Sequence, residues 1–229
     1  MNLLAFDTST EYCSLALQKG DEVFAFDINA GQTHSQIILP QIQALLGEAK
    51  LSLSDLQGIA FGAGPGSFTG VRIAAGIAQG LGFGADLPVV DICTLLALAE
   101  ASGASKVIAC LDARMGEVYH AVYEKTQNTW QTILAPGLYK PAEVPSVSGE
   151  GWVGAGSGWQ AYTEQLSLVY ATQLQGVQPE VLPTASAILA LATPIIASGH
   201  AKSAAEAMPI YIRNRVALKT VEREQGLKL

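Results

Sequence analysis

FGAGPGSFTGVRIAAGIAQGLGFG, residues 61–84, joins a glycine-rich loop to a helix of small side chains, and the rest of the chain is arranged around it. In the loop, glycines flank Pro65 and Ser67, so the backbone can adopt positive φ and approach another group closely. In the helix, Gly76, Gly80 and Gly84 lie about 6 Å apart along one face. Each interior glycine costs roughly 1 kcal/mol against alanine. We therefore expect a close neighbour on this face, either the chain's own sheet and first helix or a helix of another chain.

Length and composition bound the class of protein. A chain of 229 residues with 49% hydrophobic and 14% charged residues can bury one large core or two medium ones. Its apolar runs stop well short of the ~18 residues that span a bilayer, and the N-terminus lacks a basic region and a cleavage site. The three cysteines are odd in number and widely spaced, as is typical of reduced thiols. We therefore expect a soluble, unprocessed, cytoplasmic protein with no membrane contact.

The charge balance argues against direct binding of nucleic acid. The net charge is −7 and the sequence pI is about 4.9. Phosphate backbones are bound by clustered Lys and Arg, and no basic run occurs before Arg213 and Arg215. If nucleic acid is involved, we expect another subunit to bind it.

The first hundred residues predict an α/β unit. Alternating apolar residues indicate an opening strand followed by a hairpin. A helix capped by Thr33 or Ser35 follows, with Pro40 bending or interrupting its first turns. A short strand then enters the glycine-rich loop, and the small-residue helix begins after Gly70. The predicted strands are 2–8, 12–18, 22–28, 57–61 and 87–92, and the predicted helices are 33–49 and 70–84.

The order of elements repeats after residue 94, which predicts two related α/β halves. We place one lobe at residues 1–100 and the other at residues 101–229, with the last segment packing back on the first lobe. Pro194 is expected to kink the last helix. The predicted strands of this half are 106–112, 117–124, 129–134 and 152–155, and the predicted helices are 94–101, 159–168 and 184–198.

Two polar segments are candidates for binding phosphate. The first ends the opening strand, where either a metal–phosphate site or a simple Asx or ST turn fits. The second, in the loop, could hold phosphate on backbone N–H groups at a helix start. No lysine follows its glycines, which excludes a Walker A loop, and Ser67 lacks both a nucleophile elbow and an identifiable base. We interpret the two segments as a degenerate phosphate loop made of Asp7, Thr8, Ser9, Thr10, Gly64, Gly66 and Ser67.

Metal binding is not expected. The three histidines, His34, His120 and His200, are far apart in the sequence and have no metal-ligand spacing. The turn at residues 112–117 is crowded with charged side chains, for which a salt-bridged hairpin is favoured over a ligand-binding edge.

Strings along nearly the whole chain match one known family. GPGSFTGVRI at 64–73, followed by the small-residue helix, is the most specific of them. The others are LAFDTS at 4–9, HSQ at 34–36, DAR at 112–114, EVY at 117–119 and PIYIR at 209–213. In these strings the sequence resembles the TsaB (YeaZ) family, which works in bacterial formation of threonylcarbamoyladenosine in tRNA.

The resemblance implies a two-lobed, actin-like α/β fold of the ASKHA or ribonuclease H-like type, in which each lobe is a mixed sheet with flanking helices. It also implies a non-catalytic scaffold that binds the catalytic paralogue TsaD and allows TsaE to join. The histidine pair that TsaD uses to hold a metal has no counterpart near residues 90–96. A member of this family forms homodimers when alone, meets tRNA only through the complex, and has no cofactor of its own, with any nucleotide at the subunit joint.

The resemblance further implies an interface formed by two helices of the first lobe, matching residues 33–46 and 70–84. The expected interface residues are His34, Ile37, Ile38, Gln41, Ile42, Leu45, Val71, Arg72, Ala75, Gly76, Gln79, Gly80 and Phe83.

Two other classes of function stay open. One is an enzyme, either an actin-fold ATP-dependent phosphotransferase that uses Asp7 with the glycine-rich loop or, less in keeping with the residues, a peptidase that uses Ser67. The other is a self-associating module with no enzyme partner, which would form no complex with TsaD.

Overall fold

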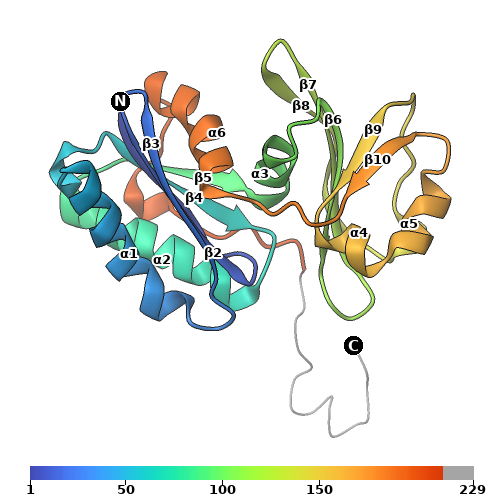
Figure 1. Cartoon of the computed structure of the whole chain (residues 1–229), viewed down its shortest axis with the longest axis horizontal. Helices are drawn as coiled ribbons and strands as arrows, with labels where there is room; N and C mark the ends of the chain where they lie inside the picture. The colour runs from blue at the N-terminus through green and yellow to red at the C-terminus, as the bar shows by residue number, and fades with distance from the viewer. Residues whose placement is uncertain (214–229) are drawn as a thin grey trace, which may run out of the picture.

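Residues 1–213 are described by a computed structural model, which contains two five-stranded mixed sheets placed next to each other (Figure 1). The strand orders are β3-β2-β1-β4-β5 and β10-β9-β6-β7-β8. In each sheet, three antiparallel strands continue into two parallel ones. This confirms the predicted two-lobed α/β fold of actin-like type.

The first sheet is built from the strands that the alternation of apolar residues predicts. β1 (Asn2–Asp7), β2 (Tyr12–Lys19) and β3 (Glu22–Asn29) form the antiparallel part. β4 (Gly58–Gly64) and β5 (Val89–Cys93) run parallel to β1.

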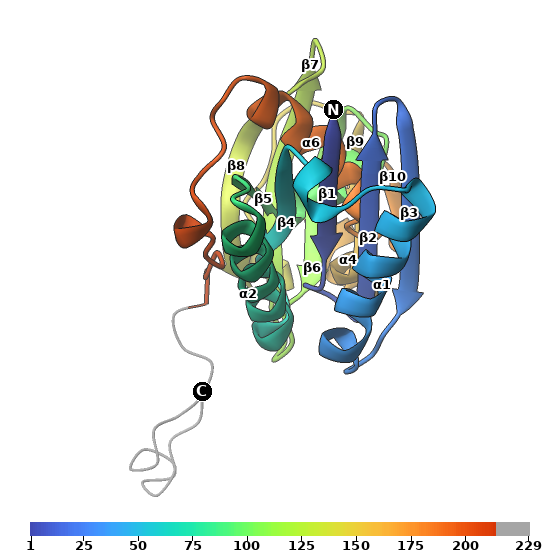
Figure 2. The same cartoon turned by 90° about the vertical axis from the view of Figure 1, so that its left-hand side faces the viewer.

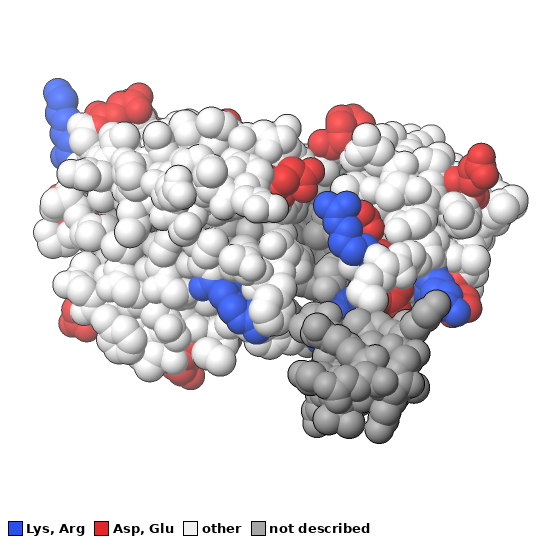
Figure 3. Space-filling view, turned by 90° about the horizontal axis from the view of Figure 1, so that it is seen from below, with Lys and Arg blue, Asp and Glu red and all other residues white. Residues whose placement is uncertain are grey.

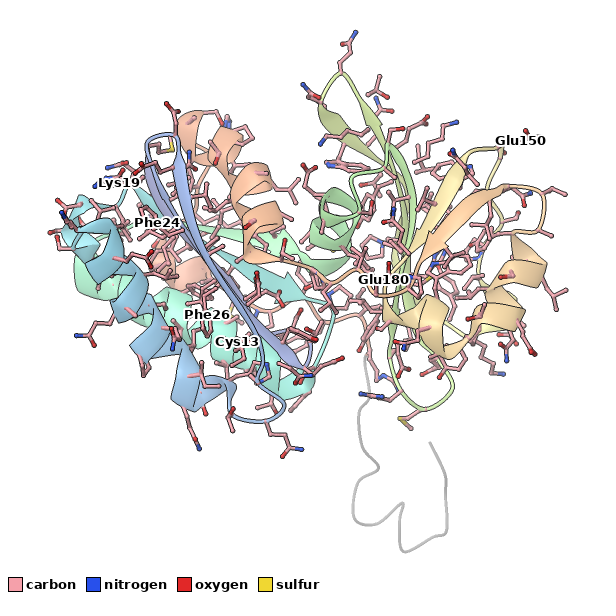
Figure 4. The ribbon with its side chains drawn as sticks, in the orientation of Figure 1. Cys13, Lys19, Phe24, Phe26, Glu150 and Glu180 are labelled. Atoms are coloured by element: carbon pink, nitrogen blue, oxygen red, sulfur yellow. The ribbon has the colours of Figure 1, made fainter. Side chains whose placement is uncertain are left out.

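Helices cover both faces of this sheet. On one face α1 (His34–Ala49) and α2 (Phe68–Ala85) lie next to each other in front of the strands (Figure 2). They pack on a cluster that includes Phe6 and Phe61, and Phe24 and Phe26 of β3 extend this cluster at the edge (Figure 4). On the other face, α6 (Ala185–Ala197) packs on smaller side chains such as Leu3.

The second sheet consists of β6 (Lys106–Asp112), β7 (Val118–Thr126), β8 (Thr129–Tyr139), β9 (Trp152–Ala155) and β10 (Leu174–Gln178). One of its faces is covered by α3 (Thr94–Ala101), and the other by α4 (Ser157–Ala161) and α5 (Thr163–Val169).

Two helices cross between the halves of the sequence. α3 precedes residue 102 but packs on the second sheet, and α6 comes near the end of the described chain but packs on the first. The segment that carries Glu180 links β10 to α6 across the molecule (Figure 4). α3 and α6 also contact each other between the two sheets. Each sheet is therefore completed by a helix from the other half of the chain, and the predicted lobe boundary near residue 100 stays a prediction.

Prolines do not interrupt the helices that contain them. α1 continues through Pro40, where an interruption was one expectation, and α6 continues through Pro194. Proline removes one N–H and leaves the carbonyl four residues earlier without its helical partner. Both prolines are exposed, as are Gln36 and Ala190 four residues before them, so water can bond to the two carbonyls.

Three further elements differ from the expectation. The helix predicted at 159–168 is two short helices separated at Tyr162, and α2 begins at Phe68 rather than after Gly70. β10 was not predicted at all. Its sequence, LQGVQ, has no apolar alternation, because an exposed edge strand needs little apolar surface.

The last described segment, residues 202–213, is here called the C-terminal strap; it passes along the side of α2 in Figure 2. It first pairs with the edge of the first sheet, where Lys202 and Val89 exchange two backbone hydrogen bonds of 2.8 Å. Unpaired edge strands invite pairing with other chains, so this contact protects β5.

The strap then joins the two lobes. The Ile210 N–H donates to the Ala63 carbonyl at 2.7 Å in the first lobe. At its end, the Arg213 guanidinium pairs with the Glu117 carboxylate at 2.8 Å in the second lobe.

Among the residues that the structure describes, no helix is long and apolar enough to cross a membrane.

Candidate functional site

The glycine-rich loop packs against the end of β1. β4 continues to Gly64 and α2 begins at Phe68, so only residues 65–67 are true loop. A Cβ atom at Gly66 would overlap the Ser9 carbonyl oxygen, and one at Gly70 would overlap the Thr8 carbonyl oxygen. The close approach that the glycines allow is therefore made to the chain itself.

Asp7 forms a hydrogen-bonded turn with its neighbours. Its buried carboxylate accepts hydrogen bonds from the Ser9 N–H at 2.9 Å and the Ser9 hydroxyl at 2.8 Å. The Thr10 hydroxyl accepts from Tyr12 N–H at 3.1 Å. Burial raises the pKa of Asp7 to about 6, although the Ser9 hydrogen bonds oppose the shift. Of the two alternatives for this segment, the geometry supports the Asx turn.

Ser67 has a structural role at the start of α2. Its hydroxyl oxygen accepts a hydrogen bond from Gly70 N–H at 3.3 Å, which is a helix N-cap. Its own N–H donates to the Ser9 carbonyl at 2.7 Å. Loop, β1 turn and helix start are thereby held together as one unit that orients α2.

The two small-residue rows of α2 have different environments. The row that contains Ala74, Ala78 and Gly82 is buried, and a Cβ atom at Gly82 would lie 2.7 Å from the Ala204 Cβ of the strap. The row of Gly76, Gly80 and Gly84 is exposed, and a Cβ atom at any of them would meet no atom of the described chain within 4 Å. Of the two neighbours considered for the row of Gly76, Gly80 and Gly84, an internal one is therefore not found among the described residues.

The outer faces of α1 and α2 form a surface of low charge, which we call the docking surface. The two helices carry two charged residues between them, Glu48 and Arg72. Figure 3, which shows the molecule from the end where α1 and α2 begin, has few charged atoms on the first lobe. Phe83 is 64% exposed on this surface. The predicted interface residues that reach it are Ile37, Gln41, Arg72, Gly76, Gln79, Gly80 and Phe83.

The other six predicted interface residues do not reach the docking surface, because they are buried inside the first lobe. Their predicted place at the interface is corrected here. Apolar residues at helical spacing in α1 face the chain's own sheet, and the ring of His34 lies 3.1 Å from the Tyr12 carbonyl oxygen. Exposed apolar residues that the sequence did not single out are Leu39 and Phe68, about half exposed. The six buried residues are His34, Ile38, Ile42, Leu45, Val71 and Ala75.

A cavity of about 710 Å³ lies between the lobes. It is lined by the β1 turn, the loop, the 111–115 segment, the start of α4 and Arg213. In that segment Arg114 pairs with Asp112 at 2.9 Å, as the expected salt-bridged hairpin requires, whereas Glu117 pairs with Arg213 of the strap instead.

The histidines are not gathered into a site. His120 is buried and bonds to the Tyr170 hydroxyl at 2.8 Å, while His200 is exposed and bonds to Ser198. Within residues 1–213 no group of three or more His, Cys, Asp or Glu side chains could hold a metal ion.

Two mixed sheets with flanking helices, joined by crossing helices and a strap, define an actin-like, ribonuclease H-like protein. A family model described as "TsaD: tRNA N6-adenosine threonylcarbamoyltransferase" matches residues 28–212. The chain is 42% identical over 229 residues to the tRNA threonylcarbamoyladenosine biosynthesis protein TsaB of Escherichia coli K12, covering 96% of this chain and 97% of that protein. The chain belongs to the TsaB (YeaZ) family.

Further relatives are similar to this chain over most of its length. TsaB of Haemophilus influenzae is 40% identical over 232 residues and covers 96% of both chains. YeaZ from Pseudomonas aeruginosa superposes with a TM-score of 0.85 at 38% identity, covering 92% of this chain and 99% of that one. A second solved structure, described as an uncharacterized protein with similarity to peptidase YeaZ, gives 0.86 at 37% identity, covering 93% and 99%.

Proposed function

We propose that the chain is a non-catalytic subunit of the complex that forms threonylcarbamoyladenosine in tRNA, and that it supports the catalytic relative TsaD. Its relatives are named for this biosynthesis, and the family model that matches it carries the name of the transferase. In this proposal TsaE joins the pair, tRNA binds only to the assembled complex, and any nucleotide lies at the subunit joint. The complex would form in the cytoplasm.

The observation that carries the proposal is the exposed glycine row of α2. Glycines at Gly76 and Gly80 cost helix stability of roughly 1 kcal/mol each and receive no internal packing in return. A glycine row lets the backbone of a second helix approach closely. The surrounding surface is poor in charge and carries the exposed Phe83, which is the composition of an interface core.

The same surface would serve the homodimer when the partner is absent. Because one surface cannot hold two partners, added TsaD should convert homodimer into heterodimer rather than form a larger assembly. Light scattering coupled to size-exclusion chromatography measures this exchange directly.

A single substitution tests the docking surface. Gly80→Leu puts a branched side chain on the glycine row, which should abolish the complex with TsaD while circular dichroism stays unchanged. Gly176→Leu is the matched control, because Gly176 is also exposed with nothing within 4 Å of its added Cβ, but lies on edge strand β10 of the second lobe. Normal complex formation by the Gly80→Leu chain would rule out this surface.

The cavity between the lobes keeps an enzyme as the second candidate. In a phosphotransferase the 710 Å³ cavity beside the loop and the β1 turn would hold ATP. Asp7 itself is buried and bonded to Ser9, which argues against a role in holding a metal. Sustained ATP hydrolysis by the isolated chain, lost in Asp7→Ala, would establish the enzyme and overturn the scaffold proposal.

A further inference from the structure

At the start of α2, one cation lies close to two aromatic rings. The Cζ atom of Arg72 lies 3.3 Å from the ring centroid of Phe68 and 4.8 Å from that of Tyr211 on the strap. Nη1 also donates to the Phe68 carbonyl at 2.7 Å. Phe68 and Tyr211 are each about half exposed, so the three side chains form a small cluster at the surface.

This arrangement leaves the edge of the guanidinium available. A guanidinium has five N–H donors, and the described residues accept one hydrogen bond from Arg72. The two rings lie against the guanidinium and restrict its motion. A fixed guanidinium edge matches the two oxygens of a carboxylate, which it can bind in bidentate fashion.

The surroundings favour an anion. Arg72 and Arg213 both line a cavity of about 290 Å³ between the start of α2, the strap and Tyr119 of β7. Arg213 is neutralised by Glu117, whereas no ion pair is formed by Arg72 within residues 1–213.

The low charge of the docking surface favours a protein carboxylate over an RNA phosphate. RNA backbones are bound by several cations together, and Arg72 is the single Lys or Arg of α1 and α2. We propose that Arg72 is the charged anchor of the docking surface and binds an Asp or Glu side chain that the docked subunit inserts into the 290 Å³ cavity. This inference rests on the proposed function, since it names the chemistry by which that partner is recognised.

The test measures the dissociation constant of the full-length chain with TsaD by calorimetry at several salt concentrations. Arg72→Met should raise Kd roughly 10- to 100-fold and flatten its salt dependence, because a charge-assisted pair is lost. Arg72→Lys should give a Kd between those of the unchanged chain and of Arg72→Met, since lysine keeps the charge but loses the planar fork of the guanidinium. Arg114→Met, which removes another exposed arginine, is the control and should leave Kd unchanged. An unchanged Kd and salt dependence for Arg72→Met would overturn the proposal.

Further variants separate the anchor from its alternatives. If Gly80→Leu abolishes binding but Arg72→Met does not weaken it, the anchor is wrong and the docking surface stands. If neither weakens binding, the docking surface fails as well. Loss of tRNA capture with an unchanged Kd for TsaD would assign Arg72 to phosphate and overturn the proposal. Rescue of Arg72→Glu by an Asp or Glu→Arg change on TsaD would establish the pair.

Discussion

Replacing Gly80 by alanine should stabilise the isolated chain. An alanine in the interior of a helix is favoured over glycine by about 1 kcal/mol, and the added Cβ would meet no atom of the described chain within 4 Å. For a chain of this length about 1 kcal/mol corresponds to a rise of roughly 2–4 °C in Tm. Differential scanning calorimetry of the isolated chain at low concentration measures the shift.

Gly82→Ala is the control, two residues further along the same helix on the buried side. Its Cβ would lie 2.7 Å from the Ala204 Cβ and 3.2 Å from the Leu87 carbonyl oxygen, so the strap must shift. Overpacking of this kind costs about 1–3 kcal/mol, and Tm should fall. The reasoning fails if Gly80→Ala lowers Tm, because the glycine row would then have an internal neighbour.

Three other substitutions test two buried polar groups and one that is partly buried. Burial raises the pKa of Asp7 to about 6, so the charge of Asp7 destabilises the fold above that pH. Asp7→Asn should therefore raise the unfolding free energy by about 3 kcal/mol at pH 8 and change this free energy little below pH 4, as measured by urea titration. Burial lowers the pKa of His120 to about 4, so stability is lost as pH falls from about 6.5 to 4. His120→Gln should flatten this dependence of the unfolding free energy on pH. The reasoning is contradicted if the variant and the unchanged chain show parallel slopes. Arg213→Met should lower the free energy of unfolding by about 1–2 kcal/mol and speed hydrogen exchange at residues 113–117. Unchanged exchange at these residues would show that the strap does not hold this turn.

The sequence predicts those elements whose apolar residues recur at a regular spacing. Alternation defines β1 to β3, and spacing of three and four defines α1, because one side of each element must face a core. Such patterns mark an apolar side but do not say whether it meets the chain's own sheet or a partner. For this reason Ile38 and Ile42 were predicted at the interface although they lie in the core.

Features that depend on distant residues could not be predicted. The break at Tyr162, the edge strand β10 and the path of the strap carry no periodic signal. Which residues lie next to each glycine also depends on the tertiary structure. Gly66 is required by the Ser9 carbonyl, a residue 57 positions earlier, while a Cβ atom at Gly80 would meet no atom of the described chain within 4 Å.

The crossing of α6 onto the first sheet has a consequence for synthesis on the ribosome. Leu3, Ala5 and Ala60 are covered by Ile188 and its neighbours, which are translated long after the strands they protect. A nascent chain that stops before residue 185 leaves that face of the sheet in water, even though α1 and α2 are already complete. The surface formed by α1 and α2 is therefore carried by a fully covered sheet only after residues 185–197 have been translated, and a chain terminated earlier exposes an apolar face behind it.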